Sequence, residues 1–396
     1  MILRLLTSGE SHGPGYVMIL DGLPAGLPLE PEMINRDLTQ RQQGAGAGLR
    51  MKIEKDRVKI IGGVLENRTT GGPVSFFIEN LDHKNWRGRA VKPFVVPRPG
   101  HADLAAAVKY GYDDLRPGLE RASARETTAR VAAGAVCRML LAQFNIRVGG
   151  YVSAIGPVIA DLSQLSFEER IRRARLSSVL CPDPQASQAM EEAIDLAVKT
   201  GDTLGGVIEV VALGLPVGLG SFVQWDRRLD ARLAYAIMSI PAVKGLEFGP
   251  AFENSLRSGS QVQDAIDLEG GELVRRTNRA GGLEGGITNG QPLHVRAAFK
   301  PIPTLRMSLP SVDLSTGSAK ASVYERSDTC QVPRAVVVVE AMTAFTVADA
   351  LLEKLGGDTL VEIKERYAAL KSLQVESLSL SGESHIFWPE ENHDDS

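Results

Sequence analysis

The sequence predicts an α+β fold that contains an internally pseudo-duplicated unit. Apolar runs of strand length occur between longer stretches with helical periodicity. One combination, a strand followed by a GLPxGL turn and an amphipathic helix, occurs twice, at residues 16–42 and 207–239. The 396 residues include 43% hydrophobic and 23% charged side chains, which is typical of a soluble globular protein with a substantial core. We therefore expect one pseudo-symmetric body and not two unrelated domains.

The predicted elements follow in chain order from the periodicity and the turn residues. Strands are expected at residues 2–7, 16–20, 58–64, 72–78, 153–159, 207–213 and 293–299. Helices are expected at residues 31–42, 185–200, 227–239 and 335–355, with a further helix that begins near Ser123. We expect a single domain at residues 1–355, and a C-terminal helix with a disordered acidic tail at residues 356–396.

The composition argues against several classes of function. A net charge of -4 and an aromatic content of 5% are not typical of a protein that binds DNA or RNA. The three cysteines, Cys137, Cys181 and Cys330, lie far apart, so we predict no metal site and a reducing compartment. The N-terminus lacks the pattern of a signal peptide, and we find no run of the roughly 18 apolar residues that span a membrane. We expect a cytoplasmic protein.

Residues 98–130 carry an unusual density of arginine for an acidic chain. Ser123 and Glu126 fit the capping-box pattern, which places a helix start near Ser123. Helix starts attract phosphates and carboxylates, because their backbone N–H groups and the positive end of the helix dipole are exposed. Arg125 and Arg130 would project from the first two turns. The pattern predicts an anion site, and an ordinary capped helix with solvated arginines is the alternative for this segment taken alone.

Two histidines lie in glycine- and proline-rich loops, where enzymes often place reactive groups. His12 is in GESHGPG directly after the first expected strand, and His101 is in RPGHAD. An imidazole can donate or accept a proton near neutral pH. The other unusual segments are two glycine-rich loops at residues 40–51 and 281–290, the corner KPIPT at residues 300–304, and RSDTC further on. Each motif taken alone is also typical of a plain loop.

Taken together and in order, GESHG, RPGHAD, SARETxxR, GLxGGxxNG, KPxxT and RSDTC resemble the chorismate synthase family over residues 1–355. The resemblance implies a β-α-β sandwich in which sheets enclose a helical layer, and a homotetramer. It also implies a lyase that uses reduced FMN with no net redox change. The reaction implied is the 1,4-anti elimination of phosphate from 5-enolpyruvylshikimate 3-phosphate, which yields chorismate in the shikimate pathway to the aromatic amino acids.

The resemblance also implies roles for individual residues. His12 resembles the group that protonates or hydrogen-bonds the departing phosphate, His101 the group that sets the protonation of the flavin, and Asp328 the relay for the substrate proton. The implied substrate-binding residues are Ser11, Arg41, Arg125 and Arg130. The implied FMN-binding residues are Arg121, Ala122, Ser123, Pro241, Ala242, Gly285, Lys300, Pro301, Ile302, Pro303, Thr304 and Arg326.

The first glycine-rich loop departs from the pattern of the family, which reads closer to RRQxGYGRG. Gln40, Ala45 and Ala47 replace two arginines and the tyrosine, and the change at Ala47 concerns a contact to substrate or to NADP. Two alternatives remain: a net redox enzyme that uses FMN with NADPH, and a noncatalytic protein that binds phosphate ligands. The chain has no clear GxGxxG element after a strand, which disfavours the first, and its intact histidines and Asp328 disfavour the second.

Overall fold

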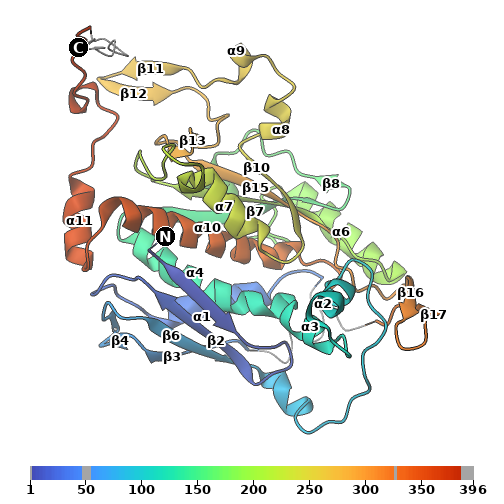
Figure 1. The fold of residues 1–396 in the computed structure, drawn as a ribbon. Helices are drawn as coiled ribbons and strands as arrows, with labels where there is room; N and C mark the ends of the chain where they lie inside the picture. Colours follow the sequence, from blue (N-terminus) through green and yellow to red (C-terminus); the bar gives the residue numbers. More distant parts are fainter. Residues whose placement is uncertain (1, 47–54, 325–327, 385–396) are drawn as a thin grey trace, which may run out of the picture.

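The structure, a computed structural model, describes residues 2–46, 55–324 and 328–384. Two antiparallel sheets lie on opposite sides of a layer of helices (Figure 1). In spatial order the four-stranded sheet consists of β1 (Arg4–Ser8), β2 (Gly15–Asp21), β6 (Val74–Glu79) and β3 (Val58–Gly62). The five-stranded sheet consists of β10 (Val243–Phe248), β15 (Leu293–Phe299), β9 (Gly206–Leu213), β7 (Arg147–Ile155) and β8 (Val158–Ile159).

Four two-stranded hairpins and a set of helices complete the described chain. The hairpins pair β4 (Val64–Leu65) with β5 (Arg68–Thr69), β11 (Ile266–Glu269) with β12 (Glu272–Arg275), β13 (Leu283–Glu284) with β14 (Ile287–Thr288), and β16 (Pro310–Asp313) with β17 (Ser318–Ala321). The α-helices are α1 (Pro31–Gln42), α2 (Asp103–Tyr110), α3 (Arg116–Arg121), α4 (Thr127–Ala142), α5 (Phe167–Ala174), α6 (Pro184–Thr200), α7 (Leu229–Met238), α8 (Ala251–Asn254), α9 (Gly259–Val262), α10 (Val332–Leu355) and α11 (Leu360–Ala368). Short 3₁₀ turns are η2 (Leu81–Asn85), η3 (Ala124–Glu126), η4 (Trp225–Arg227) and η5 (Val375–Ser377).

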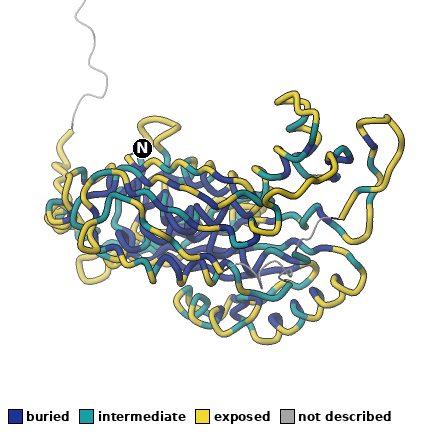
Figure 2. Tube along the Cα trace, turned by 90° about the horizontal axis from the view of Figure 1, so that it is seen from below, coloured by how far each residue is buried: buried dark blue, intermediate teal, exposed yellow. Residues whose placement is uncertain are grey.

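Helices α4 and α10 form the centre of the helical layer. Helix α10 packs on α4 on one side and on β7 and β9 on the other, while α4 and α1 pack on the four-stranded sheet. The buried residues are concentrated in this layer and along the inner faces of both sheets (Figure 2). The mixed helix and strand content expected from the sequence is confirmed.

The expectation that the chain has no apolar segment long enough to span a membrane is wrong for helix α10. It is long and apolar enough to cross a membrane, although no such segment was expected from the sequence. In this structure 94% of its most apolar stretch is buried inside the protein. A helix that is apolar on all sides is typical of the centre of a large core as well as of a membrane span. The contacts of α10 with α4, β7 and β9 make it a core helix.

The contact between α4 and α10 depends on Gly134. A methyl group added there would overlap the backbone and side chain of Ala341 on α10. We expect Gly134→Ala to lower the free energy of unfolding by about 1–3 kcal/mol, because the two helices must move apart. Denaturant unfolding at neutral pH measures this loss. Gly259→Ala is the matched control, since a methyl group there meets no atom within 4 Å, and an equal loss in both variants would contradict the prediction.

The two GLPxGL turns are held by the same hydrogen bonds. Thr69 Oγ1 donates to the carbonyl oxygen of Pro24 at 2.5 Å and accepts from the backbone N–H of Leu27 at 2.9 Å. Thr288 Oγ1 makes the corresponding bonds with the turn at residues 214–219, at 2.7 and 2.8 Å. Each threonine ends a short hairpin, β4–β5 or β13–β14. The strand, turn and helix therefore recur with equivalent local bonding, while a duplication of the whole chain stays a prediction.

The two ends of the described chain meet other elements far away in sequence. The backbone N–H groups of Ile2 and Leu3 donate to Asp349 Oδ1 on α10, at 2.7 and 2.8 Å. At the other end, residues 373–375 bond to the β11–β12 hairpin, for example from Leu273 N to Leu373 O at 2.9 Å. The expected C-terminal helix corresponds to α11, and part of the expected disordered tail, residues 385–396, lies outside the described residues.

Most expected elements agree with the structure to within a few residues. Helix α1 and strand β15 have the bounds that the pattern predicts. The single strand expected at residues 153–159 is wrong, because β7 begins at Arg147 and a turn that contains Gly156, with φ of 53°, separates it from β8. Glycine adopts this left-handed conformation without the strain that a side chain would cause.

Candidate active site

A cavity of about 670 Å³ collects residues that are far apart in the sequence. This volume is within the range of ligand pockets, about 300–1,000 Å³. The structure brings the following predicted site residues to its wall: Ser11, His12, Arg41, His101, Arg121, Ala122, Ser123, Arg125, Arg130, Pro241, Ala242, Lys300, Ile302, Pro303, Thr304 and Asp328.

Two predicted residues are not in this wall, and a third cannot be placed. Pro301 lies between two lining residues but is not one of them. Gly285 lies at the tip of the β13–β14 hairpin, where its φ of 59° fits a left-handed turn position. Arg326 lies outside the described residues.

The wall is strongly cationic although the chain as a whole is acidic. Its charged side chains are seven arginines and Lys300, against the two carboxylates Glu126 and Asp328. Burial, together with the nearby Lys244, lowers the pKa of Lys300 below its ordinary value. Clustered cations in a partly closed site attract anionic ligands more strongly than they would in water. The cavity therefore fits a ligand with several negative charges.

His12 is held by Glu120 at the end of α3. Its Nδ1 lies 2.7 Å from Glu120 Oε1, and its backbone N–H donates to Glu120 Oε2 at 2.7 Å. The ring contacts Trp86 in a tilted arrangement, with centroids 4.1 Å apart. Burial would raise the pKa of Glu120, but the hydrogen bonds from His12 outweigh it and lower that pKa. An ionised Glu120 accepts a hydrogen bond from the N–H at Nδ1, which leaves Nε2 as the available ring nitrogen.

His101 is bound to a buried carboxylate that is itself paired with arginine. Its Nδ1 lies 2.6 Å from Asp103 Oδ1 at the start of α2. Arg98 Nε and Nη2 donate to the two oxygens of Asp103 at 2.8 and 2.9 Å, and Arg98 Nη1 donates to Thr304 Oγ1 at 3.3 Å. Burial would raise the pKa of Asp103, but the bonds from Arg98 and His101 hold it well below its ordinary value. Nε2 of His101 is again the available ring nitrogen.

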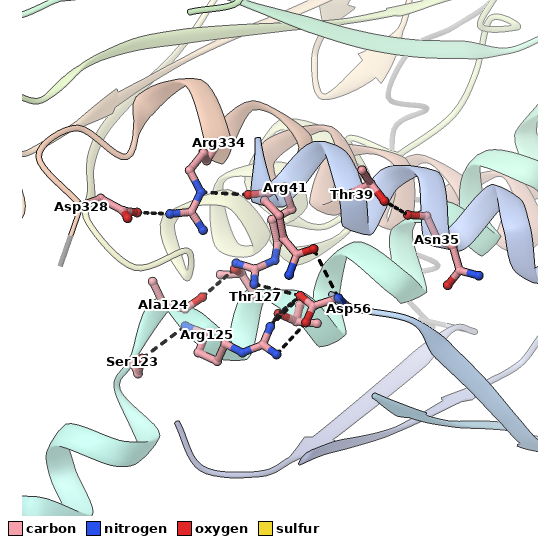
Figure 3. A network of polar contacts seen from close by, with 12 residues as sticks. Asn35, Thr39, Arg41, Asp56, Ser123, Ala124, Arg125, Thr127, Asp328 and Arg334 are labelled. Atoms are coloured by element: carbon pink, nitrogen blue, oxygen red, sulfur yellow. Dashed lines mark hydrogen bonds and ion pairs between the residues drawn. The ribbon is translucent and has the colours of Figure 1, made fainter. Parts of the chain in front are cut away.

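Arg41 and Arg125 share one buried counter-ion, Asp56 (Figure 3). Arg125 Nη1 and Nη2 donate to the two oxygens of Asp56, both at 2.6 Å, and Arg41 Nη2 donates at 3.2 Å. Burial lowers the pKa of Arg41 to about 10, although Asp56 raises it. Burial would raise the pKa of Asp56, but the two arginines lower it. Two positive charges against one negative charge leave a net positive charge in this part of the wall.

Asp328 and Arg334 form an ion pair beside this group (Figure 3). Arg334 Nε also donates to the carbonyl oxygen of Arg41 at 2.9 Å. Arg334 is in the first turn of α10, so the core helix positions both the acid and the end of α1. This arrangement connects the predicted relay residue to a predicted substrate-binding arginine.

The helix expected to begin near Ser123 begins later. Ser123 precedes the 3₁₀ turn η3, and α4 begins at Thr127. Ser123 Oγ accepts from Arg125 N at 3.3 Å and not from residue 126, and the Glu126 side chain pairs with Arg130. The capping box expected there is therefore wrong. The tighter turn places Ser123 Oγ 3.2 Å from Ser11 Oγ at the cavity wall.

Two predicted arginines are bound at the edge of the cavity. Arg130 Nη1 donates to Ser239 Oγ at 2.6 Å, and Arg121 Nη2 donates to Thr7 Oγ1 at 3.0 Å. These contacts hold the end of β1 and the loop after α7 against the α3–α4 segment. Arg121 also donates to the carbonyl oxygens of Thr7 and Gly9, at 3.2 and 3.5 Å, and Arg130 Nε pairs with Glu126.

Sequence reasoning missed the partners of the predicted residues. Glu120, Asp103, Asp56, Arg98 and Arg334 each bind a predicted site residue. The motif RPGHAD contains Arg98 and Asp103, so its two charged residues could have indicated the pair. Asp56 and Glu120 lie in no motif, and no sequence signal points to them.

Comparisons with known proteins agree on one family. The family model described as chorismate synthase matches residues 3–352. The chorismate synthase of Syntrophotalea carbinolica is 54% identical over 377 residues, covering 93% of this chain and 97% of that protein. The one from Chlorobaculum tepidum is 51% identical, covering 92% and 96%. A solved structure described as the crystal structure of chorismate synthase is 43% identical with a TM-score of 0.77, covering 93% of this chain and 97% of that one. The chain therefore belongs to the chorismate synthase family.

Proposed function

We propose that the chain is a chorismate synthase that eliminates phosphate from 5-enolpyruvylshikimate 3-phosphate to form chorismate, with reduced FMN as cofactor. One observation carries the proposal: a cavity with a large excess of cations also contains two histidines, each with Nδ1 bound to a carboxylate. The substrate has two carboxyl groups and a phosphate, so it requires such an excess of positive charge. From the resemblance we further propose a homotetramer located in the cytoplasm.

The residues at one part of the wall fit a flavin nucleotide. Pro241 and Ala242 offer an apolar surface, and Ala242 has a φ of 73°, a strained conformation for a residue with a side chain. Such strain is typical of backbone that contacts a ligand. Lys300 and Thr304 supply a cation and a hydroxyl for a phosphate. Together with the segment 121–123, these residues would hold FMN.

When bound, reduced FMN would supply electron density to the elimination with no net redox change. The residues of the chain bind the substrate and transfer the protons. Arg41, Arg125 and Arg130 bind and orient the anionic substrate, and preorganised cations stabilise the negative charge that develops on the departing phosphate. His12 supplies a proton to that phosphate from Nε2. Asp328 receives the proton that the substrate loses, while Arg334 holds its carboxylate in place.

An anaerobic assay with purified protein, 5-enolpyruvylshikimate 3-phosphate and chemically reduced FMN tests the proposal. We expect phosphate and chorismate in equal amounts while the flavin stays reduced. Flavin oxidation in step with product would contradict the proposed lyase, and so would binding of both ligands with no product. Rapid reduction of bound FMN by NADPH without added substrate would instead favour a net redox enzyme.

A further inference from the structure

We propose that Glu120 is a positioning residue that gives His12 a single tautomer and a single ring orientation. The inference rests on the proposed function and adds a residue to the machinery of that site. Glu120 lies outside all six motifs on which the family resemblance depends. Its side chain contacts the cavity only through His12, so its effect on the reaction is indirect.

The geometry of the carboxylate defines the tautomer. Both oxygens of Glu120 bind the same residue, one at the backbone N–H and one at Nδ1, each at 2.7 Å. The bond to the backbone N–H prevents the carboxylate from swinging away from the ring. An ionised carboxylate only accepts hydrogen bonds, so Nδ1 must carry a hydrogen. Nε2 is then the one ring nitrogen whose proton can be exchanged with a ligand.

Contacts on the other sides of the residue limit its movement. The Trp86 ring lies 4.1 Å from the imidazole ring between centroids, at an interplanar angle of 42°. His83 Nδ1 lies 2.9 Å from the carbonyl oxygen of His12, and Asn80 Nδ2 donates to the carbonyl oxygen of Ser11 at 2.7 Å. The loop and the ring are therefore held from η2 as well as from α3. The exposed fraction of the His12 side chain is 18%, which leaves one edge accessible.

The ionised state of Glu120 is compatible with the proton transfer proposed for His12. The titratable or charged groups near His12 include Glu120 at the ring, His83 at its carbonyl oxygen and Arg116 beside Glu120, and the arginines of the wall line the same cavity. The hydrogen bonds from His12 lower the pKa of Glu120 despite burial, so this carboxylate stays ionised at neutral pH. A doubly protonated imidazole can give its Nε2 proton to the departing phosphate and become neutral with Nδ1–H still in place.

Glu120→Gln tests the proposal because the amide has nearly the same shape. Its NH₂ group can donate to Nδ1, which stabilises the opposite tautomer, and its charge is lost. We expect kcat for phosphate release to fall about 10- to 100-fold, with KM nearly unchanged. Glu120→Asp keeps the charge but reaches only one of the two donors, so its kcat should lie between those of the wild type and Glu120→Gln. Glu10→Gln, an exposed residue of the same loop, is the matched control.

A double-mutant comparison separates positioning from a general structural role. In a His12→Ala background we expect Glu120→Gln to change kcat by less than about twofold, because its effect passes through the imidazole. An equal fold-loss in both backgrounds would overturn the proposal, and so would an unchanged kcat in the single variant. NMR of ¹⁵N-labelled histidine in the protein without ligands gives a second readout, in which neutral His12 should carry its hydrogen on Nδ1. A hydrogen on Nε2 would overturn the proposal even if the assay for the proposed function detects no turnover.

Discussion

Asp56→Ala should lower the free energy of unfolding at neutral pH by about 3–5 kcal/mol, the cost of leaving buried charges without a counter-ion. The Asp56 side chain is fully buried and binds both Arg41 and Arg125, which are themselves buried. Removal of the carboxylate leaves two guanidinium groups that repel each other. Denaturant unfolding measures the loss. Asp161→Ala, which removes an exposed carboxylate, is the control and should lower the stability far less than Asp56→Ala.

Asp56→Asn keeps the shape of the side chain and supplies a second readout if the alanine variant does not fold. Uncompensated arginines should bind anions more strongly, so added phosphate should raise the Tm of Asp56→Asn more than that of the wild type. The pKa of Asp56 in the folded protein is below its ordinary value. The contribution of Asp56 to stability is therefore present above the ordinary carboxyl pKa, about 4. It is lost as the pH falls through the lower pKa that Asp56 has in the folded protein. The acid-induced loss of stability should be smaller in Asp56→Asn, and equal acid sensitivity would contradict the assignment of Asp56 as the counter-ion.

His101→Ala should reduce kcat about 100- to 10,000-fold while the dissociation constant of the substrate changes little. The variant removes the imidazole but leaves Asp103 bound to both donors of Arg98, so the carboxylate stays compensated and the fold should persist. The cations that bind the substrate are not altered. Anaerobic phosphate release at saturating reduced FMN measures kcat, and calorimetric titration measures substrate binding. Lys109→Ala on the exposed face of α2 is the control, and unchanged turnover in His101→Ala would remove His101 from the mechanism.

The local elements of this fold were predictable because their signals are local. Helix α1 has proline at its start and a buried stripe at helical spacing, and its bounds agree with the prediction. Strand β15 is a short apolar run with glycine and proline nearby, and its bounds also agree. The pairing of the strands and the register between them depend on contacts between residues that are far apart in the sequence. A single sequence carries no signal for those contacts. A local signal can also mislead. The capping pattern at Ser123 predicts a helix start, but the chain forms a 3₁₀ turn there instead.

The candidate site was predictable to the extent that residues lie in motifs. His12, His101 and Asp328 all line the cavity. Their partners could not be predicted in the same way, because a carboxylate that neutralises an arginine can come from any part of the chain. Asp56 is 69 residues before Arg125, and Glu120 is 108 residues after His12. The sequence therefore indicated residues that line the cavity, while the structure shows what holds them.

The hydrogen bonds from Ile2 and Leu3 to Asp349 join the two ends of the chain, so the fold cannot be completed until α10 has been synthesised. Strands β1, β2, β6 and β3 can pair early, because their partners are close in sequence. The side of α4 that packs on α10 stays uncovered until residues 332–355 have left the ribosome. A nascent chain of 330 residues thus exposes a broad apolar helix face, and such intermediates aggregate easily. Refolding from denaturant must also bring the two ends of the chain together, and this long-range closure slows the last step of folding.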